Sequence, residues 1–357
     1  MSFAAGTHLV PGSNRFTSIE VCAGAGGQAI GLHRAGFEHV ALVELDHHAA
    51  ETLRINGARS GWWRPEAVHE CSLVGWRPPR GVRVDLVSGG VPCPPFSIAG
   101  RQLGEEDERD LFPAVLDLVE CVKPRAVMIE NVRGLLGAKF AEYRARIRGR
   151  LAELGYESDW KLLEAHEFGV PQLRPRSILV AAKPTVWKHF NWPVPGEAPT
   201  PTVGEVLYPL MAAAGWEGAA AWRERANAIA PTLVGGSKKH GGADLGPTRA
   251  KRQWRDDLGV DAKVLADAPP PPGFRGDPKL TVEMTAVIQG FPADWQFAGK
   301  KTAKYRQIGN AFPPPVAEAV GLSIAHALRL ADEARRRRSR SAVARRVSAA
   351  GRFVHAS

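Results

Sequence analysis

The chain has 357 residues, 44% of them hydrophobic, which is enough to bury a large core without disulfides or structural metals. Its four cysteines are widely spaced and form no Cys-x-x-Cys or Cys/His cluster, which argues against a zinc site and a disulfide framework. The start of the chain lacks the features of a secretion signal, and no apolar run is long enough to span a bilayer. We therefore expect a cytoplasmic protein with no metal and no membrane segment.

The net charge of +10 is concentrated at one end of the sequence. Residues 335–357 contain eight arginines and no acidic residue, which leaves 39 basic against 37 acidic residues in the remainder. Arginine-rich ends of this kind are typically solvated. We expect residues 333–357 to form a disordered basic tail that adds nonspecific affinity for DNA.

The first element is a β-rich run at residues 16–22, followed directly by a glycine turn and a helical segment that ends at Gly36. Helical stretches separate the later apolar runs, which lie at 39–45, 84–90, 126–131 and 177–182. This alternation predicts an α/β fold with a doubly wound, mostly parallel, Rossmann-like sheet.

The pattern changes after residue 182. Residues 183–301 are rich in Pro, Gly, Trp and Ala and have little sustained periodicity, which predicts a second, smaller, loop-rich domain. A stripe of Val316, Val320, Ile324 and Leu328 then predicts a helix that packs back on the first domain. We therefore expect a first domain of residues 14–182, completed by residues 302–332.

The glycine turn at residues 23–29 fits the loose nucleotide-binding fingerprint, because Gly24-x-Gly26-x-x-Ala29 lies between a strand and a helix. Glu44 follows at the end of the second predicted strand, where an acid can accept hydrogen bonds from ribose hydroxyls. The pattern predicts an adenosyl nucleoside site. By itself it also fits NAD, or a turn that needs glycine only for packing.

Cys93 lies in the segment GGVPCPPFS (residues 89–97), just beyond the carboxyl end of a predicted strand, where open α/β sheets place their ligands. A lone cysteine is most often a small buried apolar residue. Here the prolines on both sides of the thiol fix φ and remove backbone donors, which favours one orientation of the sulfur. The segment therefore predicts a reactive thiol beside the nucleoside site.

Three charged residues are predicted to reach the same crevice. Glu130 ends the predicted strand at 126–131, and Arg174 and Arg176 come just before the strand at 177–182. A thiol, a carboxyl and two guanidiniums beside an adenosyl site form a set that suits nucleophilic catalysis.

These elements together resemble the cytosine-5 DNA methyltransferase family of bacterial restriction-modification systems. The resemblance covers about residues 16–182 and 281–330, in the family's order. Its segments are EVCAGAGG, VPCPPFS, RDLF, ENV, QLRPR, IQGFP and YRQIGNAFPPPV. It implies transfer of a methyl group from S-adenosylmethionine to carbon 5 of a flipped-out cytosine in a short specific sequence of duplex DNA.

The resemblance also implies the roles of the catalytic residues. Cys93 would add to carbon 6 of cytosine, and Glu130 would hold a proton at ring nitrogen 3. Arg176, with Arg174 behind it, would donate to the cytosine carbonyl oxygen.

S-Adenosylmethionine is implied to bind along the glycine turn and the neighbouring strand ends. Cys22 stands where the family has an aromatic residue, and Glu70 is the nearest candidate for the acid that usually follows the third strand. The expected cofactor-binding residues are Cys22, Gly24, Ala25, Gly27, Glu44, Leu45, Pro92, Leu111, Asn310 and Ala311.

In the family, the region that corresponds to residues 183–301 holds target recognition. Its segment 237–255 has six Lys or Arg residues against one Asp, although such charge runs are often only solvated. We expect a monomer acting on double-stranded DNA, associated with the nucleoid through that DNA, with or without a companion restriction endonuclease. The expected DNA-binding residues are Ser97, Gln172, Arg249, Lys251, Arg252 and Arg255.

Three alternatives stay open from the sequence. A tRNA methyltransferase of the same family would carry the same Cys93, Glu130 and Arg176, although the long region 183–301 favours DNA. A nicotinamide-dependent oxidoreductase would explain the glycine turn and Glu44 but not the other segments. A non-catalytic DNA-binding protein would need neither the thiol nor the carboxyl.

Overall fold

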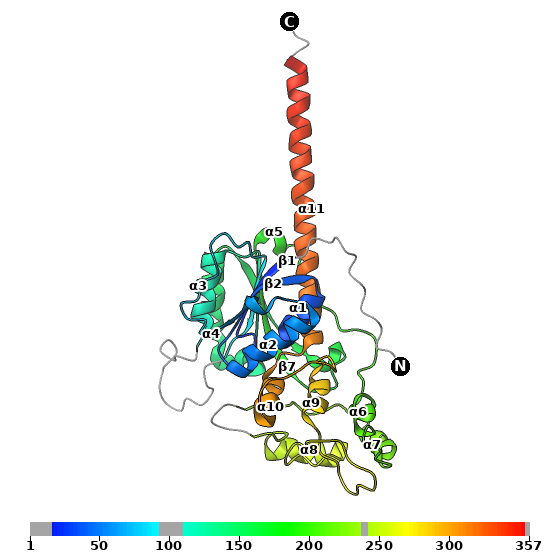
Figure 1. Cartoon of the computed structure of the whole chain (residues 1–357). Coiled ribbons are helices and arrows are strands. Elements are labelled where there is room, and N and C mark those ends of the chain that lie inside the picture. Colours follow the sequence, from blue (N-terminus) through cyan, green and yellow to red (C-terminus); the bar gives the residue numbers. More distant parts are fainter. Residues whose placement is uncertain (1–15, 93–109, 237–241, 354–357) are drawn as a thin grey trace.

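The computed structural model describes residues 16–92, 110–236 and 242–353, with side chains described as far as residue 341. A seven-stranded sheet with the order β3-β2-β1-β4-β5-β7-β6 forms the centre of the molecule (Figure 1). Neighbours among β1 to β5 pair in parallel, and β7 is antiparallel to both β5 and β6. The strands are β1 (Phe16–Val21), β2 (Phe37–Glu44), β3 (Val68–Glu70), β4 (Leu86–Gly90), β5 (Ala126–Val132), β6 (Glu157–Glu164) and β7 (Pro175–Ala182).

The predicted mostly parallel sheet is confirmed, and all five predicted strands are present. The chain leaves β1 toward β2 and β3 on one side and continues with β4 and β5 on the other. The strand order therefore reverses between β1 and β4, and open α/β sheets bind ligands at the carboxyl ends of the strands at such a point.

Helices cover both faces of the sheet (Figure 1). On β5, Met128 packs with α1 (Gly27–Arg34) and the first part of α11 (Pro314–Phe353). The adjacent Val127 faces the opposite way and packs with α3 (Phe112–Val122) and α4 (Ala141–Glu153). The sheet is thus buried on both sides, which explains why its central strands are almost continuously apolar.

The region after β7 consists of loops and short helices, as the sequence predicts. Most of these helices share a core around Trp254 and Tyr305, and that core continues into Leu53 of α2 (His47–Ser60). The helices are α5 (Pro184–Trp187), α6 (Val203–Met211), α7 (Ala219–Arg225), α8 (Thr248–Leu258), α9 (Val282–Gln289) and α10 (Lys301–Asn310). Short 3-10 turns lie at Pro65–Ala67, Arg133–Leu136, Ala138–Phe140 and Ala165–Phe168.

The expected disordered tail is instead the continuation of α11, which runs as one helix from Pro314 to Phe353. The physical reason lies in composition: between Gly321 and Gly351 the sequence has no Gly or Pro and is rich in Ala and Arg, which have high helix propensity. Ala331 is the last buried residue in the described part of this helix. No helix in the described ranges is long and apolar enough to cross a membrane.

Candidate active site

A cavity of about 740 Å³ lies at the carboxyl ends of the central strands. The turn after β1, the ends of β2 and β5 and the segment Ala303–Phe312 contribute to its wall. Nine of the ten expected cofactor-binding residues line it: Cys22, Gly24, Gly27, Glu44, Leu45, Pro92, Leu111, Asn310 and Ala311. Ala25 is the exception, because it is buried behind the turn, where its carbonyl accepts a hydrogen bond from Trp295 Nε1 at 3.1 Å.

The glycine turn has two separate requirements for glycine. Gly24 has a φ of +55°, in the left-handed region. Gly27 has an ordinary φ, but a Cβ atom there would overlap the carbonyl oxygen of Phe312. The turn therefore serves close packing against residues 311–312 as well as the shape of the cavity.

Glu44 braces this turn from the end of β2. One carboxylate oxygen accepts a hydrogen bond from Gly24 N and the other from Asp46 N, each at 2.7 Å. Burial raises the pKa of Glu44 despite these hydrogen bonds. The carboxyl lines the cavity, so its remaining acceptor capacity faces the ligand space.

Apolar groups form one part of the cavity wall. Leu45 and Val74 are 72% and 65% exposed, and both line the cavity. Burial, with smaller contributions from Glu44 and Glu20, raises the pKa of the Cys22 thiol to about 12. Cys22 therefore stays neutral and acts as an apolar surface. This part of the wall suits a flat aromatic ring.

Two buried polar residues of the cavity were not predicted as site residues. Oε2 of Glu20 and both amide atoms of Gln28 are buried and have no partner at good hydrogen-bond geometry. The Gln28 side chain and the Ala29 backbone lie near enough to Glu20 to lower its pKa, but burial outweighs them. Burial raises the pKa of Glu20 well above its usual value. Buried polar groups are normally paired, so these atoms indicate a polar ligand. Glu20 precedes the glycine turn by only a few residues, and that position was the available signal in the sequence.

Glu70 lies outside the wall, where it accepts hydrogen bonds from Arg54 at 2.8 Å and His47 at 2.9 Å. The cavity wall near β3 comes instead from Cys71, Ser72, Leu73 and Val74. No clear motif marks this segment in the sequence, so its contribution to the cavity was not predictable.

Glu130 and Arg176 form a buried ion pair at the cavity. Arg176 Nε lies 2.7 Å from Glu130 Oε1, and the two side chains are 12% and 11% exposed. Burial raises the pKa of Glu130, against the opposing effect of Arg176 and Arg174. The Asn131 side chain donates to the carbonyl of Val91 at 3.0 Å, so the end of β5 is tied to the segment that leads to Cys93. A carboxyl in this setting can hold a proton at a pH where an exposed one would not.

The structure places Arg174 away from the open cavity. Its side chain is completely buried, and its guanidinium donates to the carbonyls of Leu233, Gly309 and Ala311 at 2.8 to 2.9 Å. Burial lowers its pKa well below the usual value. This geometry fits a residue that holds the loops around the site rather than one that contacts a base.

The prediction that Gln172 contacts DNA is wrong. This side chain is fully buried, where it donates to Gln289 Oε1 at 2.7 Å and accepts from Leu233 N at 2.9 Å. The motif that contains Gln172 packs in the interior, between β7 and the residues that follow β7 in the chain. It does not present a surface to a nucleic acid.

Cys93 and Ser97 lie outside the described residues. On either side of that gap, Pro92 and Leu111 both line the cavity. The chain therefore leaves the described part at the cavity wall and returns to it close to the same place.

The basic residues of α8 divide into two kinds. Arg249 and Arg252 are exposed, and they take part in no ion pair among the described residues. Lys251 pairs with Asp244 at 3.2 Å, and Arg255 pairs with Asp256 at 2.8 Å. Arg249 and Arg252 are therefore the stronger candidates for phosphate contacts. Within the described ranges no cluster of His, Cys, Asp and Glu could hold a metal ion.

Comparison with known proteins agrees with this geometry. The family model for C-5 cytosine-specific DNA methylases matches residues 16–326. The chain belongs to this family. It is thus a DNA cytosine-5 methyltransferase, and the family depends on S-adenosylmethionine.

Two relatives resemble the chain over most of its length. The Type II methyltransferase M.NaeI of Lentzea aerocolonigenes is 57% identical over 322 residues, which are 89% of this chain and 77% of the relative. The Type II methyltransferase M.NgoMIV of Neisseria gonorrhoeae is 51% identical over 321 residues, which are 88% of this chain and 99% of the relative. The family is therefore supported by similarity over most of the chain.

Solved structures support the fold. A putative DNA modification methyltransferase encoded within a prophage of Escherichia coli superposes with a TM-score of 0.62 at 22% identity, over 88% of this chain and 99% of that one. The Dnmt2 methyltransferase of S. pombe gives a TM-score of 0.53 at 16% identity, over 88% of this chain and 99% of that one. At these identities the likeness concerns architecture alone.

Proposed function

We propose that the chain methylates carbon 5 of a cytosine within a short specific sequence of duplex DNA, with Cys93 as the nucleophile. One observation supports this most directly. A single cavity joins the glycine turn, Pro92, which directly precedes Cys93, and the buried Glu130 that pairs with Arg176. The proposed cofactor site, the proposed acid and the residue before the proposed nucleophile thus border one cavity.

The cavity fits S-adenosylmethionine, which when bound supplies the methyl group on a sulfonium. Glu44 would accept from the ribose hydroxyls, and Leu45 and Val74 would pack against the adenine. The unpaired atoms of Glu20 and Gln28 would receive the charged end of the methionine moiety. Asn310 and Ala311 would border the same end.

The chain's own residues would then act on the base. The Cys93 thiolate would add to carbon 6, which makes carbon 5 nucleophilic, and Glu130 would hold a proton at ring nitrogen 3. After the methyl transfer, loss of the proton on carbon 5 and departure of the thiolate would restore the ring. The raised pKa of Glu130 suits this task, because burial favours the protonated form of the carboxyl.

The arginines would have different tasks. Arg176 would hold Glu130 and donate to the carbonyl oxygen of the base, since a guanidinium offers several fixed donors. Arg174 is assigned as a positioning residue, because carbonyls of the surrounding loops take its donors. Ser97, Arg249 and Arg252 would contact phosphate or base edges of the flanking duplex, with Lys251 and Arg255 released from their acidic partners on binding.

The biological setting follows from the relatives. Both are named as Type II methyltransferases, so we place this enzyme in a restriction-modification system, where a companion endonuclease would cut the unmethylated sequence. It would act as a monomer on DNA in the cytoplasm and associate with the nucleoid through that DNA. Residues 183–301 would carry target recognition.

The test is the identity of the methylated product. The enzyme is incubated with S-adenosylmethionine labelled in the methyl group, and with duplex DNA or tRNA offered separately. Hydrolysis of the nucleic acid and chromatography should recover the label as 5-methylcytosine from DNA. Label recovered in another base, or only from tRNA, would contradict the proposal.

A further inference from the structure

The outer part of α11 leaves the body of the protein. Ala331 is its last buried residue in the described part, and every residue from Arg335 to Ser341 is exposed. The helix projects away from the sheet, on the side opposite to α8 and α9 (Figure 1). From Glu333 to Phe353 it extends by about 30 Å at 1.5 Å per residue. The side chains described in this segment, those of residues 333–341, therefore add nothing to the hydrophobic core.

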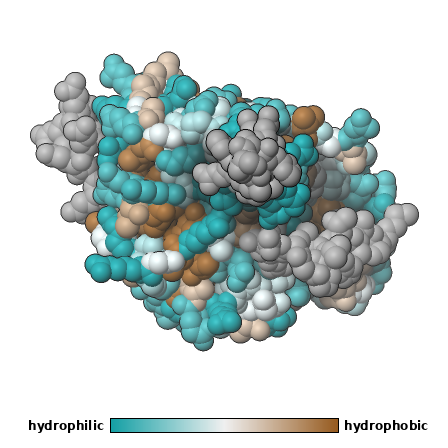
Figure 2. All heavy atoms as spheres, turned by 90° about the horizontal axis from the view of Figure 1, so that it is seen from above, coloured by the Kyte–Doolittle hydropathy of each residue, from teal (hydrophilic) through white to brown (hydrophobic). Residues whose placement is uncertain are grey.

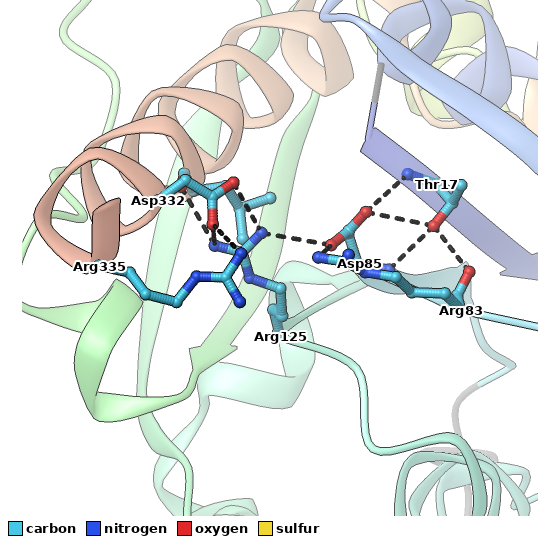
Figure 3. A network of polar contacts seen from close by, with 7 residues as sticks. Thr17, Arg83, Asp85, Arg125, Asp332 and Arg335 are labelled. Carbon is cyan, nitrogen blue, oxygen red and sulfur yellow. Dashed lines mark hydrogen bonds and ion pairs between the residues drawn. The ribbon is translucent and has the colours of Figure 1, made fainter. Parts of the chain in front are cut away.

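A network at the base of this segment sets its direction (Figure 3). Arg125 donates to both carboxylate oxygens of Asp332, at 2.8 and 3.2 Å, and to the carbonyl of Leu328 at 3.2 Å. The same guanidinium reaches Asp85 at 3.3 Å, whose other oxygen accepts from the Thr17 backbone at 3.0 Å. We call these residues, Thr17, Asp85, Arg125 and Asp332, the arginine clamp. It joins α11 to the amino ends of β1, β4 and β5.

The charge of the outer helix is large and of one sign. Arginines occupy positions 335, 336, 337, 338 and 340, and no acidic residue follows Glu333. The remainder of the chain is nearly neutral, with 39 basic against 37 acidic residues. Like charges three and four positions apart destabilise a helix, so this segment is best stabilised by a polyanion.

The arrangement of the arginines indicates which polyanion fits. At about 100° per residue, Arg335, Arg336, Arg337 and Arg338 point to four different sides of the helix. Only Ser339 and Ser341 interrupt them, so the described outer segment has no apolar face. A helix that lies on a membrane needs such a face. Hydrophilic residues also predominate where the helix leaves the body, seen from the end of α11 (Figure 2).

A DNA groove fits a helix that is basic all round. The major groove is about 12 Å wide, close to the diameter of a helix, and phosphates line both of its walls. We propose that residues 335–341 of α11 bind duplex DNA along a groove through phosphate contacts, independently of sequence. This surface lies at the amino ends of the strands, whereas the cavity lies at their carboxyl ends. The two surfaces therefore engage different stretches of DNA, or different duplexes.

The experiment replaces the five arginines at 335, 336, 337, 338 and 340 by glutamine in the full chain. Gln has a helix propensity close to that of Arg, so the helix is retained. A matched variant carries lysine at the same positions and keeps the charge. The probe is a 40-base-pair duplex of A·T pairs only, which contains no cytosine, and binding is followed by fluorescence anisotropy from low to high salt.

Each phosphate contact contributes about 0.9 to the slope of log Kd against log salt. In the glutamine variant the slope of log Kd against log salt should be smaller by about 3 to 4. This variant should also bind the probe at least ~10-fold more weakly at 150 mM salt. The lysine variant should stay close to the wild type. An unchanged slope in the glutamine variant, or an equal loss in the lysine variant, would overturn the proposal.

A second measurement separates this surface from the catalytic one. At low salt and saturating plasmid DNA, the glutamine variant should retain the wild-type kcat for methyl transfer, because the cavity is at the other end of the sheet. Loss of kcat together with normal binding of the A·T probe would show that the segment serves the reaction, and the proposal would be wrong.

Discussion

Buried polar groups differ in how completely they are paired at the two ends of the central sheet. At the amino ends of β1, β4 and β5, Arg125 and Asp85 are both paired with neighbouring groups. At the carboxyl ends of the same strands, Glu20 and Gln28 are buried without complete pairing, and burial raises the pKa of Glu130. The polar groups at the amino end are paired with one another, whereas the carboxyl end keeps buried polar atoms without a full set of partners beside the cavity.

The largest expected effect comes from Glu130→Gln at the carboxyl end. The variant cannot hold and release the proton at ring nitrogen 3, so the rate of methyl transfer should fall by about 10²- to 10⁴-fold. Its melting temperature should not decrease substantially, because an amide can still accept from Arg176. Initial rates with labelled cofactor measure the first effect, and thermal unfolding measures the second. The exposed Glu197→Gln serves as the control, and wild-type rates in Glu130→Gln would refute the assignment.

Arg174→Met should lower the free energy of unfolding by about 3 kcal/mol, because it removes the donor to the buried carbonyls of Leu233 and Gly309. The Ala311 carbonyl also loses a donor but keeps the hydrogen bond from Gln289. Urea unfolding followed by circular dichroism tests this. Unchanged stability combined with lost activity would return Arg174 to the catalytic role that the sequence predicted.

Arg125→Met should cost about 2 kcal/mol of stability, because it leaves the buried Asp85 with fewer partners and Asp332 with only the longer ion pair to Arg335 at 4.0 Å. Its kcat should stay near that of the wild type, since the arginine clamp lies far from the cavity. Arg83→Met is the matched control, because Arg83 also approaches Asp85 but is 69% exposed. Unchanged stability in Arg125→Met would show that the clamp adds no stability, and equal losses in both variants would show that Arg125 contributes no more than the exposed Arg83.

Glu20→Gln should have the smallest effect, and it should be stabilising. Because the folded protein raises the pKa of Glu20, the carboxyl contributes stability at low pH and loses it as the pH rises through the folded pKa. The variant should therefore unfold at a higher temperature than the wild type at pH 7 and at the same temperature near pH 4. It should also bind the cofactor more weakly.

Glu70→Gln should change stability at pH 7 in the opposite direction to Glu20→Gln. Hydrogen bonds from Arg54 and His47 lower the pKa of Glu70, so its removal should reduce stability at pH 7 and not increase it. If Glu20→Gln and Glu70→Gln change stability at pH 7 in the same direction, the opposite pKa shifts of these two carboxyl groups do not determine their effects on stability.

The sequence predicted the central strands because they are buried on both faces and therefore apolar throughout. It missed β6, an edge strand in which exposed residues such as Lys161 alternate with partly buried ones. It also missed β3, which has only three residues. Short and half-exposed strands leave little apolar signal.

The candidate site was predictable where a motif gives a residue a position, as for Glu44 and Glu130. It was less predictable where the side chain of a motif residue is buried in the interior, as for Gln172, since a motif does not show which way a side chain points. The cavity residue Ser72 comes from a segment without a clear motif, which only tertiary folding brings to the site. Similarly, arginine content suggested disorder for a segment whose helix propensity is high.

The most direct test of the account is bisulfite sequencing of plasmid DNA from cells that express the wild-type chain or Cys93→Ala. The wild type should protect cytosines within one short sequence motif, and the variant should protect none while its cofactor binding is largely retained. Protected cytosines in Cys93→Ala would contradict the assignment of the nucleophile and of the site around it.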